Sequence, residues 1–263
     1  LAALRRLVAE LAEAGLDSGW HSSGVLRIAS NPKQAKLWRR REGVRWREPD
    51  ELPAGYHAPY GGFLVEAGGY VEPRKLLDAL LQAARHRGLG LREHCRVDAL
   101  QPERESVRVE GSHGTFRADA VVLCVGASPN ARLGLPRMER LAGDVIELDS
   151  NAELPYPLAG AVYGARSRDG VYVGGNHRPA GETDPDAPAR LRQAASWFVP
   201  ALRQAAISGV WTGVRAKTAD HQPITGELRP GVWMLGALAG RGFLCSAQLA
   251  AQMADALEHR ARP

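Results

Sequence analysis

The chain has 263 residues, 44% of them hydrophobic and 24% charged, with a formal net charge of +5 and a sequence pI of about 9.4. This composition is that of a globular protein with one large core or two intergrown subdomains, and no apolar run approaches the roughly 18 residues that cross a bilayer. We therefore exclude a transmembrane helix, and the amphipathic opening segment also lacks the apolar stretch of a signal peptide.

The chain opens inside a predicted helix. Leu1, Leu4, Leu7, Val8 and Leu11 recur at the spacing of one helical face, and no capping residue precedes them. Since the first residue is also not Met, we expect the natural N-terminus to lie upstream.

Residues 38–50 (WRRREGVRWREPD) form a charged surface segment with two tryptophans, which we expect to be an exposed loop or a short helix. The basic excess of the whole chain has two explanations, solvated faces in an arginine-rich protein or an anionic partner such as a nucleic acid. Composition alone leaves both open.

An α/β unit is predicted in the middle of the chain. Its expected elements are a helix over 68–88 and strands over 89–100, 106–111, 114–118 and 117–128. Pro73 near the first helical turn and Gly88 as a stop signal bound the helix. The apolar run 120–125, which Gly126 ends, is typical of a strand buried on both faces of a parallel sheet.

The second half of the chain changes character twice. Residues 143–175 alternate strand-like runs with turn signals, which predicts an antiparallel sheet. Residues 186–207 have the pattern of a helix with an internal break at Pro200. A strand over 231–238, a glycine-rich turn over 239–243 and a helix over 244–261 are expected to follow.

The three cysteines, Cys95, Cys124 and Cys245, lie far apart and lack the spacing of a metal site. An odd number of cysteines without a C-x-x-C pair indicates a reducing compartment. We therefore expect free, buried thiols, no metal site and a cytoplasmic location.

The strongest motif is the stretch 213–257, GVRAKTADHQPITGELRPGVWMLGALAGRGFLCSAQLAAQMADAL. A strand that enters a glycine-rich turn and then a helix aims backbone N–H groups and the positive helix end at a ligand above the turn. Turns of this kind are also common in proteins where they bind no ligand. Arg215, Asp220, Pro223 and Gly226 at these spacings make the motif specific.

The sequence resembles the FAD-dependent D-amino-acid/glycine oxidase (DAO) family over nearly its whole length. The ALxxRG turn, the DHxP loop and the segments GGYVEP, VVLCVGAS and GGNHRPAGETD are most similar to the oxidoreductase domain of MnmC, a tRNA wobble-uridine modification enzyme. The resemblance implies a mixed α/β (α+β) fold, in which an FAD-binding Rossmann-like domain is intergrown with an antiparallel-sheet substrate domain and the N-terminal βαβ unit is missing.

The resemblance also implies how the chain is divided. An FAD-binding subdomain would comprise residues 1–19, 69–130 and 213–263, and a substrate-binding subdomain would comprise 20–68 and 131–212. The G-x-G-x-x-G fingerprint that binds the pyrophosphate, and the acidic residue that follows it, do not occur in the sequence. If the chain is the whole molecule, its affinity for FAD is in doubt.

Four residues match the family's substrate side. Arg215 would hold a substrate carboxylate in a bidentate pair, and Arg241 would stand over the flavin as a second substrate-side residue. Tyr163 would touch the same carboxylate, and His177 would contact the polar substrate or a phosphate. The alternatives are an ion-paired or surface arginine, a helix-end arginine, a core tyrosine and a structural histidine. His221 is expected to be a loop residue.

The residues that match the family's cofactor side lie on three predicted strands and on the glycine-rich turn: Val97, Gly126, Ala127, Gly236, Gly240, Arg241, Gly242 and Phe243. Gly126 would let the chain approach the phosphate–ribose portion of the cofactor. The sequence departs from the family at Asp144, where glutamine is usual. This difference either alters the environment of the flavin or has no effect.

The implied activity is oxidation of an N-substituted glycine, the 5-carboxymethylaminomethyl-(2-thio)uridine arm of tRNA, to an imine that hydrolyses to glyoxylate and the aminomethyl nucleoside. The partners would be tRNA and a fused or separate methyltransferase domain, with no membrane. The segment 38–50 would hold tRNA phosphates. Two rivals are an oxidase of free glycine, sarcosine or a D-amino acid, and a truncated chain that binds without catalysis.

Overall fold

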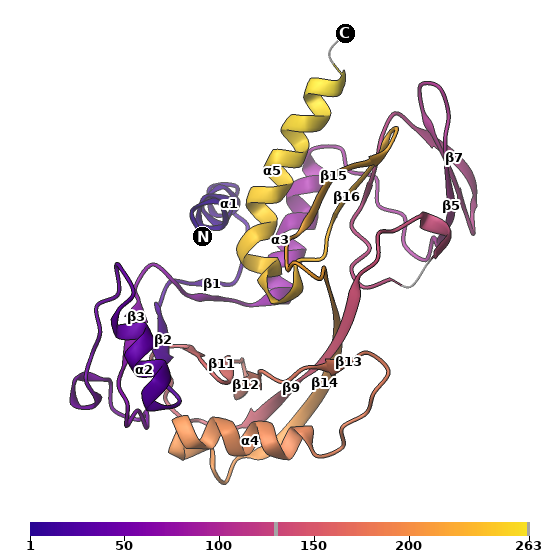
Figure 1. The fold of residues 1–263 in the computed structure, drawn as a ribbon. Coiled ribbons are helices and arrows are strands. Elements are labelled where there is room, and N and C mark those ends of the chain that lie inside the picture. Colours follow the sequence, from indigo (N-terminus) through magenta and orange to yellow (C-terminus); the bar gives the residue numbers. More distant parts are fainter. Residues whose placement is uncertain (129–130, 262–263) are drawn as a thin grey trace. The chain divides into compact units, whose positions relative to one another are not determined.

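The computed structural model describes residues 1–128 and 131–261, which form a mixture of helices and strands (Figure 1). The chain divides into two compact units. The first contains Leu1–Leu16, Leu81–Leu141 and Val214–Pro263, and the second contains Asp17–Leu80 and Ala142–Gly213. The two subdomains expected from the sequence reach residues 130 and 263, which lie outside the described part, and the roles assigned to them stay predictions.

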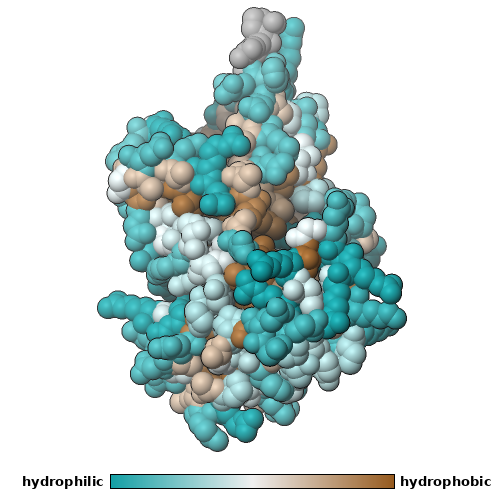
Figure 2. Space-filling model, turned by 90° about the vertical axis from the view of Figure 1, so that its left-hand side faces the viewer, coloured by the Kyte–Doolittle hydropathy of each residue, from teal (hydrophilic) through white to brown (hydrophobic). Residues whose placement is uncertain are grey.

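The first unit contains two three-stranded sheets and a pair of packed helices, α1 (Ala2–Glu13) and α5 (Gly242–Ala261). One sheet is the antiparallel meander of β5 (Val97–Pro102), β6 (Val107–Gly111) and β7 (Gly114–Ala118). The other has the order β15 (Ile224–Arg229), β16 (Val232–Gly236) and β8 (Val121–Leu123), with β16 parallel to β8. The face of the molecule in Figure 2 is mostly hydrophilic, and apolar residues gather on it below the end of α5.

Alternation along β16 builds the core of the first unit. Val232 and Met234 are fully buried, and they lie beside Val121 and Leu123 of β8. Trp233 between them points to the other face, since successive side chains of a strand alternate. The core is completed by buried residues of the meander and of the segment after β8: Leu100, Val107 and Leu133.

The second unit is built on an eight-stranded sheet, of which β9 and β14 continue into the first unit. Its strands are β2 (Val25–Ile28), β3 (Gly62–Val65), β9 (Glu139–Asp149), β10 (Leu158–Ala159), β11 (Tyr163–Arg166), β12 (Val171–Gly174), β13 (Arg178–Pro179) and β14 (Ala206–Lys217). The neighbours run in the order β13-β9-β12-β11-β10-β2-β3, and β14 pairs with β9. The remaining elements are β1 (Trp20–His21), β4 (Tyr70–Val71), α2 (Pro32–Arg39), α3 (Pro73–His86), which crosses the unit boundary, and α4 (Ala187–Phe198).

Helix α4 covers one face of this sheet. Ile146, Leu148, Val171 and Val173 are at most 1% exposed and join the α4 residues Leu191, Ala195 and Phe198 in one apolar cluster. The same alternation sends the side chains between them to the opposite face. The antiparallel sheet predicted for residues 143–175 is confirmed, because β9, β11 and β12 pair in that sense.

Several predicted elements have wrong bounds. Of the strand expected over 117–128, only Val121–Leu123 form β8. The strand expected over 89–100 starts only at Val97, because the residues before it form a loop in which His94 takes a positive φ of 56°. The helix expected to reach residue 207 ends at Phe198, since the residue before a proline disfavours helical torsions, and one 3-10 turn over Pro200–Leu202 follows. Ala206 then opens β14.

The burial predictions for β8 and for the cysteines are also wrong. The strand pairs in parallel as expected, but it is the edge strand of its sheet, and Val122 is 37% exposed. Cys124 is exposed at its end, while Cys95 and Cys245 are half-buried, so the free thiols do not lie in the core. Among the described helices, none is long and apolar enough to cross a membrane.

Candidate functional site

The turn between β16 and α5 is open above its backbone. A β-carbon built on Gly240 or Gly242 would meet no described atom within 4 Å. Ala237 and Ala239 take positive φ values of 56° and 50°, an uncommon conformation for residues other than glycine that concentrates at functional sites. Helix α5 starts at the end of this turn with no acidic side chain in its first turn. Its free N–H groups and positive end therefore favour an anionic or electron-rich ligand.

Arg241 ties this turn to the loop after β14. Its guanidinium donates a hydrogen bond to the carbonyl of His221, a loop residue with a φ of 60°. The loop is closed by Thr218, whose hydroxyl donates to the carbonyl of Gln222 over 2.7 Å. Phe243 is 45% exposed one residue into α5. The turn and the DHQP loop are thus joined, as one surface of the first unit.

Arg215 lies on β14, three residues before that loop. Its side chain is half-buried, and it forms no hydrogen bond or ion pair with any residue that the structure describes. By contrast, Lys217 two positions on is held by Glu139 of β9 over 2.9 Å. A guanidinium that no described carboxylate neutralises is suited to an external carboxylate, which it binds through two parallel hydrogen bonds.

The other residues expected on the cofactor side also belong to the first unit. Gly126 follows β8 with a φ of 60° and open space where a β-carbon would stand. The carbonyl of Ala127 accepts a hydrogen bond from Arg140 Nε over 3.0 Å. Val97 is half-buried at the start of β5, and Gly236 ends β16. An extended ligand can approach the backbone at Gly126 without meeting a side chain there.

Tyr163 lies on the face of the second unit's sheet that α4 does not cover, which we call the open face. It is 40% exposed and pairs with Gly174 of β12. Its ring lies directly over that glycine, because a β-carbon built there would be 2.2 Å from the phenol oxygen. The tyrosine is therefore not a core residue.

Two further aromatic residues share the open face, and neither was among the site residues expected from the sequence. Tyr172 alternates with the buried Val171 and Val173, and it meets the ring of Trp211 on β14 edge-on at 5.7 Å. Burial, and then the charge of Glu147, raises the pKa of Tyr172. The alternation in GVYVGG could have placed Tyr172, whereas its contact with Trp211 joins residues 39 positions apart.

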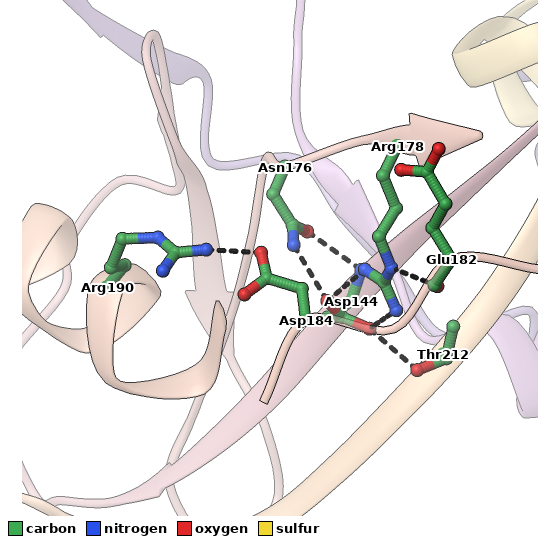
Figure 3. A network of polar contacts seen from close by, with 7 residues as sticks. All are labelled: Asp144, Asn176, Arg178, Glu182, Asp184, Arg190 and Thr212. Atoms are coloured by element: carbon green, nitrogen blue, oxygen red, sulfur yellow. Dashed lines mark hydrogen bonds and ion pairs between the residues drawn. The ribbon is translucent and has the colours of Figure 1, made fainter. Parts of the chain in front are cut away.

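His177 is exposed on the segment between β12 and β13, and both of its neighbours are anchored (Figure 3). Asn176 donates to Asp144 Oδ2 over 2.7 Å and accepts from the backbone N–H of Asp144 over 2.8 Å. Arg178 pairs with both oxygens of Asp144, at 2.5 and 3.1 Å, and Thr212 donates to it over 2.6 Å. The network fixes the backbone on both sides of a histidine whose own side chain has no described partner.

Asp144, which was expected from the sequence to depart from the family pattern, is the centre of this network. Its side chain is 4% exposed and that of Arg178 is 14% exposed. The Arg178 guanidinium, helped by Thr212 and Asn176 against the cost of burial, lowers the pKa of Asp144 from 3.8 to about 2. Around it, Arg178 Nε donates to the carbonyl of Glu182 and Arg190 pairs with Asp184.

This pKa predicts an acid-sensitive step in stability. A folded-state pKa below the unfolded one means that the carboxylate stabilises the fold above about pH 4 and that this contribution is lost as the pH falls from about 4 to about 2. The loss should be about 2 kcal/mol. Unfolding free energies of wild type and of Asp144→Asn, measured from pH 7 to pH 2, should converge in that window. Parallel curves would contradict the prediction.

The structure thus groups the predicted residues into two sets. Arg215, Arg241 and the cofactor-side residues belong to the first unit, and Tyr163 and His177 belong to the second. Within the described residues, no group of three or more His, Cys, Asp or Glu side chains could hold a metal ion. The first unit therefore carries the open turn and an arginine without a described partner, and the second unit carries an exposed aromatic sheet face.

Several known proteins are similar to this chain over most of its length. The bifunctional tRNA 5-methylaminomethyl-2-thiouridine biosynthesis protein MnmC of Maricaulis maris is 28% identical over 242 residues, which cover 91% of this chain and 39% of that protein. Glycine oxidase of Geobacillus kaustophilus is 26% identical over 97% of this chain and 74% of its own length. The crystal structure of glycine oxidase from Bacillus cereus superposes with a TM-score of 0.86 at 24% identity, over 98% of this chain and 78% of that one.

The chain spans about two fifths of the MnmC protein that it matches. The shared fold confirms the mixed α/β class expected from the sequence. The model of the family described as FAD dependent oxidoreductase (DAO) matches residues 1–256, and the chain belongs to that family.

Proposed function

We propose that the chain is the oxidoreductase part of an enzyme that oxidises the C–N bond of an N-substituted glycine. The substrate would be the 5-carboxymethylaminomethyl-(2-thio)uridine arm at the wobble position of tRNA, and the product the aminomethyl nucleoside. The observation that carries the proposal is Arg215, a half-buried guanidinium without a described partner at the family's carboxylate-binding position. The similarity to MnmC supports a tRNA substrate.

The residues present fit the family's cofactor at two places. Gly240 and Gly242 leave open space above the turn that starts α5, and Gly126 leaves open space after β8. The free N–H groups at the start of α5 suit the electron-rich ring of a flavin. When bound, FAD supplies the hydride acceptor of the reaction. The sequence has no G-x-G-x-x-G segment to hold the pyrophosphate.

In this proposal the side chains bind and position the substrate. Arg215 would hold the carboxylate by two parallel hydrogen bonds. The family resemblance gives Tyr163 a role in contacting the substrate as well. The Arg241 side chain, held by the His221 carbonyl, would stand beside the flavin. No general base is required of these residues, because fixing the glycyl methylene at the acceptor provides most of the advantage.

Arg215→Lys tests the proposal. The variant keeps the charge but loses the bidentate geometry, so the KM for the N-substituted glycine should rise about 10- to 100-fold, the equivalent of one to two charge-assisted hydrogen bonds. Nucleoside analysis by mass spectrometry, on tRNA bearing the carboxymethylaminomethyl group, should show conversion by wild type and little by the variant. Arg203→Lys, at an exposed arginine, is the matched control and should behave as wild type.

A second candidate is an oxidase of free glycine, sarcosine or a D-amino acid. It is favoured by the glycine oxidase relative, of which the chain covers 74%. Hydrogen peroxide released from free glycine or sarcosine, with no conversion of tRNA nucleosides, would replace the tRNA proposal by this one. A purified protein without flavin absorbance near 450 nm would instead favour a chain that binds without catalysis.

A further inference from the structure

A basic hollow lies on the second unit, and part of its lining comes from the segment 38–50, which was expected from the sequence to hold tRNA phosphates. The hollow has a volume of about 370 Å³ and lies between α2 and the segments that follow it. Its lining combines cations with apolar walls: Lys36, Arg39, Arg40, Glu48, Pro49 and Tyr60. In Figure 2, which shows the side of the molecule that carries α2 in Figure 1, the lower part is covered mainly by hydrophilic residues.

The charges of the hollow do not balance. Arg39 pairs with Glu48 over 2.6 Å, which neutralises one cation. Lys36 and Arg40 are exposed at the hollow and form no ion pair with a described residue. Two cations are thus available to an anion from solution.

The surroundings add to the positive charge. Arg27 lies over the ring of Trp38 at 4.9 Å, and its buried Nε has no hydrogen-bond partner among the described residues. Burial, and then repulsion by Arg41, lowers the pKa of Arg27. Arg39 lies over the ring of Trp46 at 5.2 Å. The two tryptophans therefore hold two guanidinium groups by cation–π contacts, one on the half-buried Arg27 and one on the exposed Arg39.

We propose that this hollow binds the phosphodiester backbone of RNA, and the proposal rests on the tRNA substrate proposed above. Lys36 and Arg40 would contact phosphate oxygens, and the Tyr60 ring with the neighbouring prolines would pack against a sugar or base. A polyanion fits better than a single small anion, because Arg41 and Arg45, which form no ion pair with a described residue, continue the positive charge beyond the hollow.

The test compares two double variants that lose the same charge. Lys36→Gln/Arg40→Gln removes the cations of the hollow, and Arg5→Gln/Arg6→Gln removes two exposed cations of α1 as the control. Binding of fluorescently labelled tRNA is measured by anisotropy between 50 and 300 mM salt. The hollow variant should bind about 10-fold more weakly, and its slope of log K against log salt should fall by 1 to 2, because each lost phosphate contact removes about 0.7 to 0.9.

The outcomes separate the two proposals. If both double variants lost the same tRNA affinity, the effect would come from the overall charge, and RNA binding by the hollow would be refuted. Full displacement of tRNA by inorganic phosphate at millimolar concentration would refute it as well. The 450 nm absorbance of the hollow variant is expected to be unchanged, because none of its substitutions lies at the flavin-side residues. If wild type converts tRNA nucleosides and the hollow variant binds tRNA as tightly as wild type, only the proposal on the hollow is refuted. If only the hollow variant loses tRNA affinity, and wild type converts no tRNA nucleoside, only the proposed reaction is refuted.

Discussion

Asp144→Ala is expected to lower the free energy of unfolding by about 3–5 kcal/mol. The substitution leaves the Arg178 guanidinium, 14% exposed, without the carboxylate that it contacts through two nitrogens. It also removes the acceptor of the Thr212 hydroxyl and of the Asn176 amide. Urea unfolding monitored by tryptophan fluorescence measures the loss.

Asp169→Ala is the matched control for this effect. Asp169 also faces an arginine, Arg168, but the two side chains are 85% and 93% exposed. An exposed pair contributes at most about 1 kcal/mol, so this variant should unfold nearly as wild type does. If both aspartate variants lost the same stability, burial of the Asp144 pair would not be the cause.

Gly174→Ala is expected to lower kcat/KM about 10- to 100-fold with the fold intact. The added methyl group would stand 2.2 Å from the Tyr163 hydroxyl and 2.3 Å from the ring carbon that bears it. The ring therefore has to move. If Tyr163 contacts the substrate as proposed above, displacement of that group by about 1 Å can cost up to 100-fold in rate. Steady-state kinetics with the N-substituted glycine substrate measures the effect.

Two controls make this prediction specific. Gly164→Ala on β11 adds a methyl group at ordinary distances of 3.5 Å and 3.9 Å from its nearest neighbours, so its kinetics should match wild type. In a Tyr163→Ala background, Gly174→Ala should have no further effect, since the ring it displaces is gone. A loss of the same size in that background would show that Gly174 acts by some route other than Tyr163.

The partners of Asp144 could not be expected from the sequence. In the sequence it is a single acidic residue where glutamine is usual. Its partners lie 32, 34 and 68 positions away, at Asn176, Arg178 and Thr212. No local periodicity links a strand residue to partners so distant, so only the sheet that brings β9, β13 and β14 together gives Asp144 its role.

The errors in the predicted elements have the same origin. Residues 89–96 contain enough apolar side chains to resemble a strand, yet Gly88 and His94 take positive φ values that end extended structure there. The apolar run of β8 looks fully buried, but burial depends on which strands flank it, and β8 is an edge strand of its sheet. Exposure of Cys124 follows from that position.

The sequence by itself determined the parts of this protein that depend on neighbouring residues. The alternation in residues 143–175, the glycine-rich turn before α5 and the motif around Arg215 all lie within short windows, and they were enough to identify the mixed α/β class and the FAD dependent oxidoreductase family. The tertiary structure alone decided which side chains share a surface. The ring of Tyr163 over Gly174, the ring of Trp211 against Tyr172, and the carboxylate of Asp144 between three partners each depend on strand register, which is set by contacts between segments far apart in the chain.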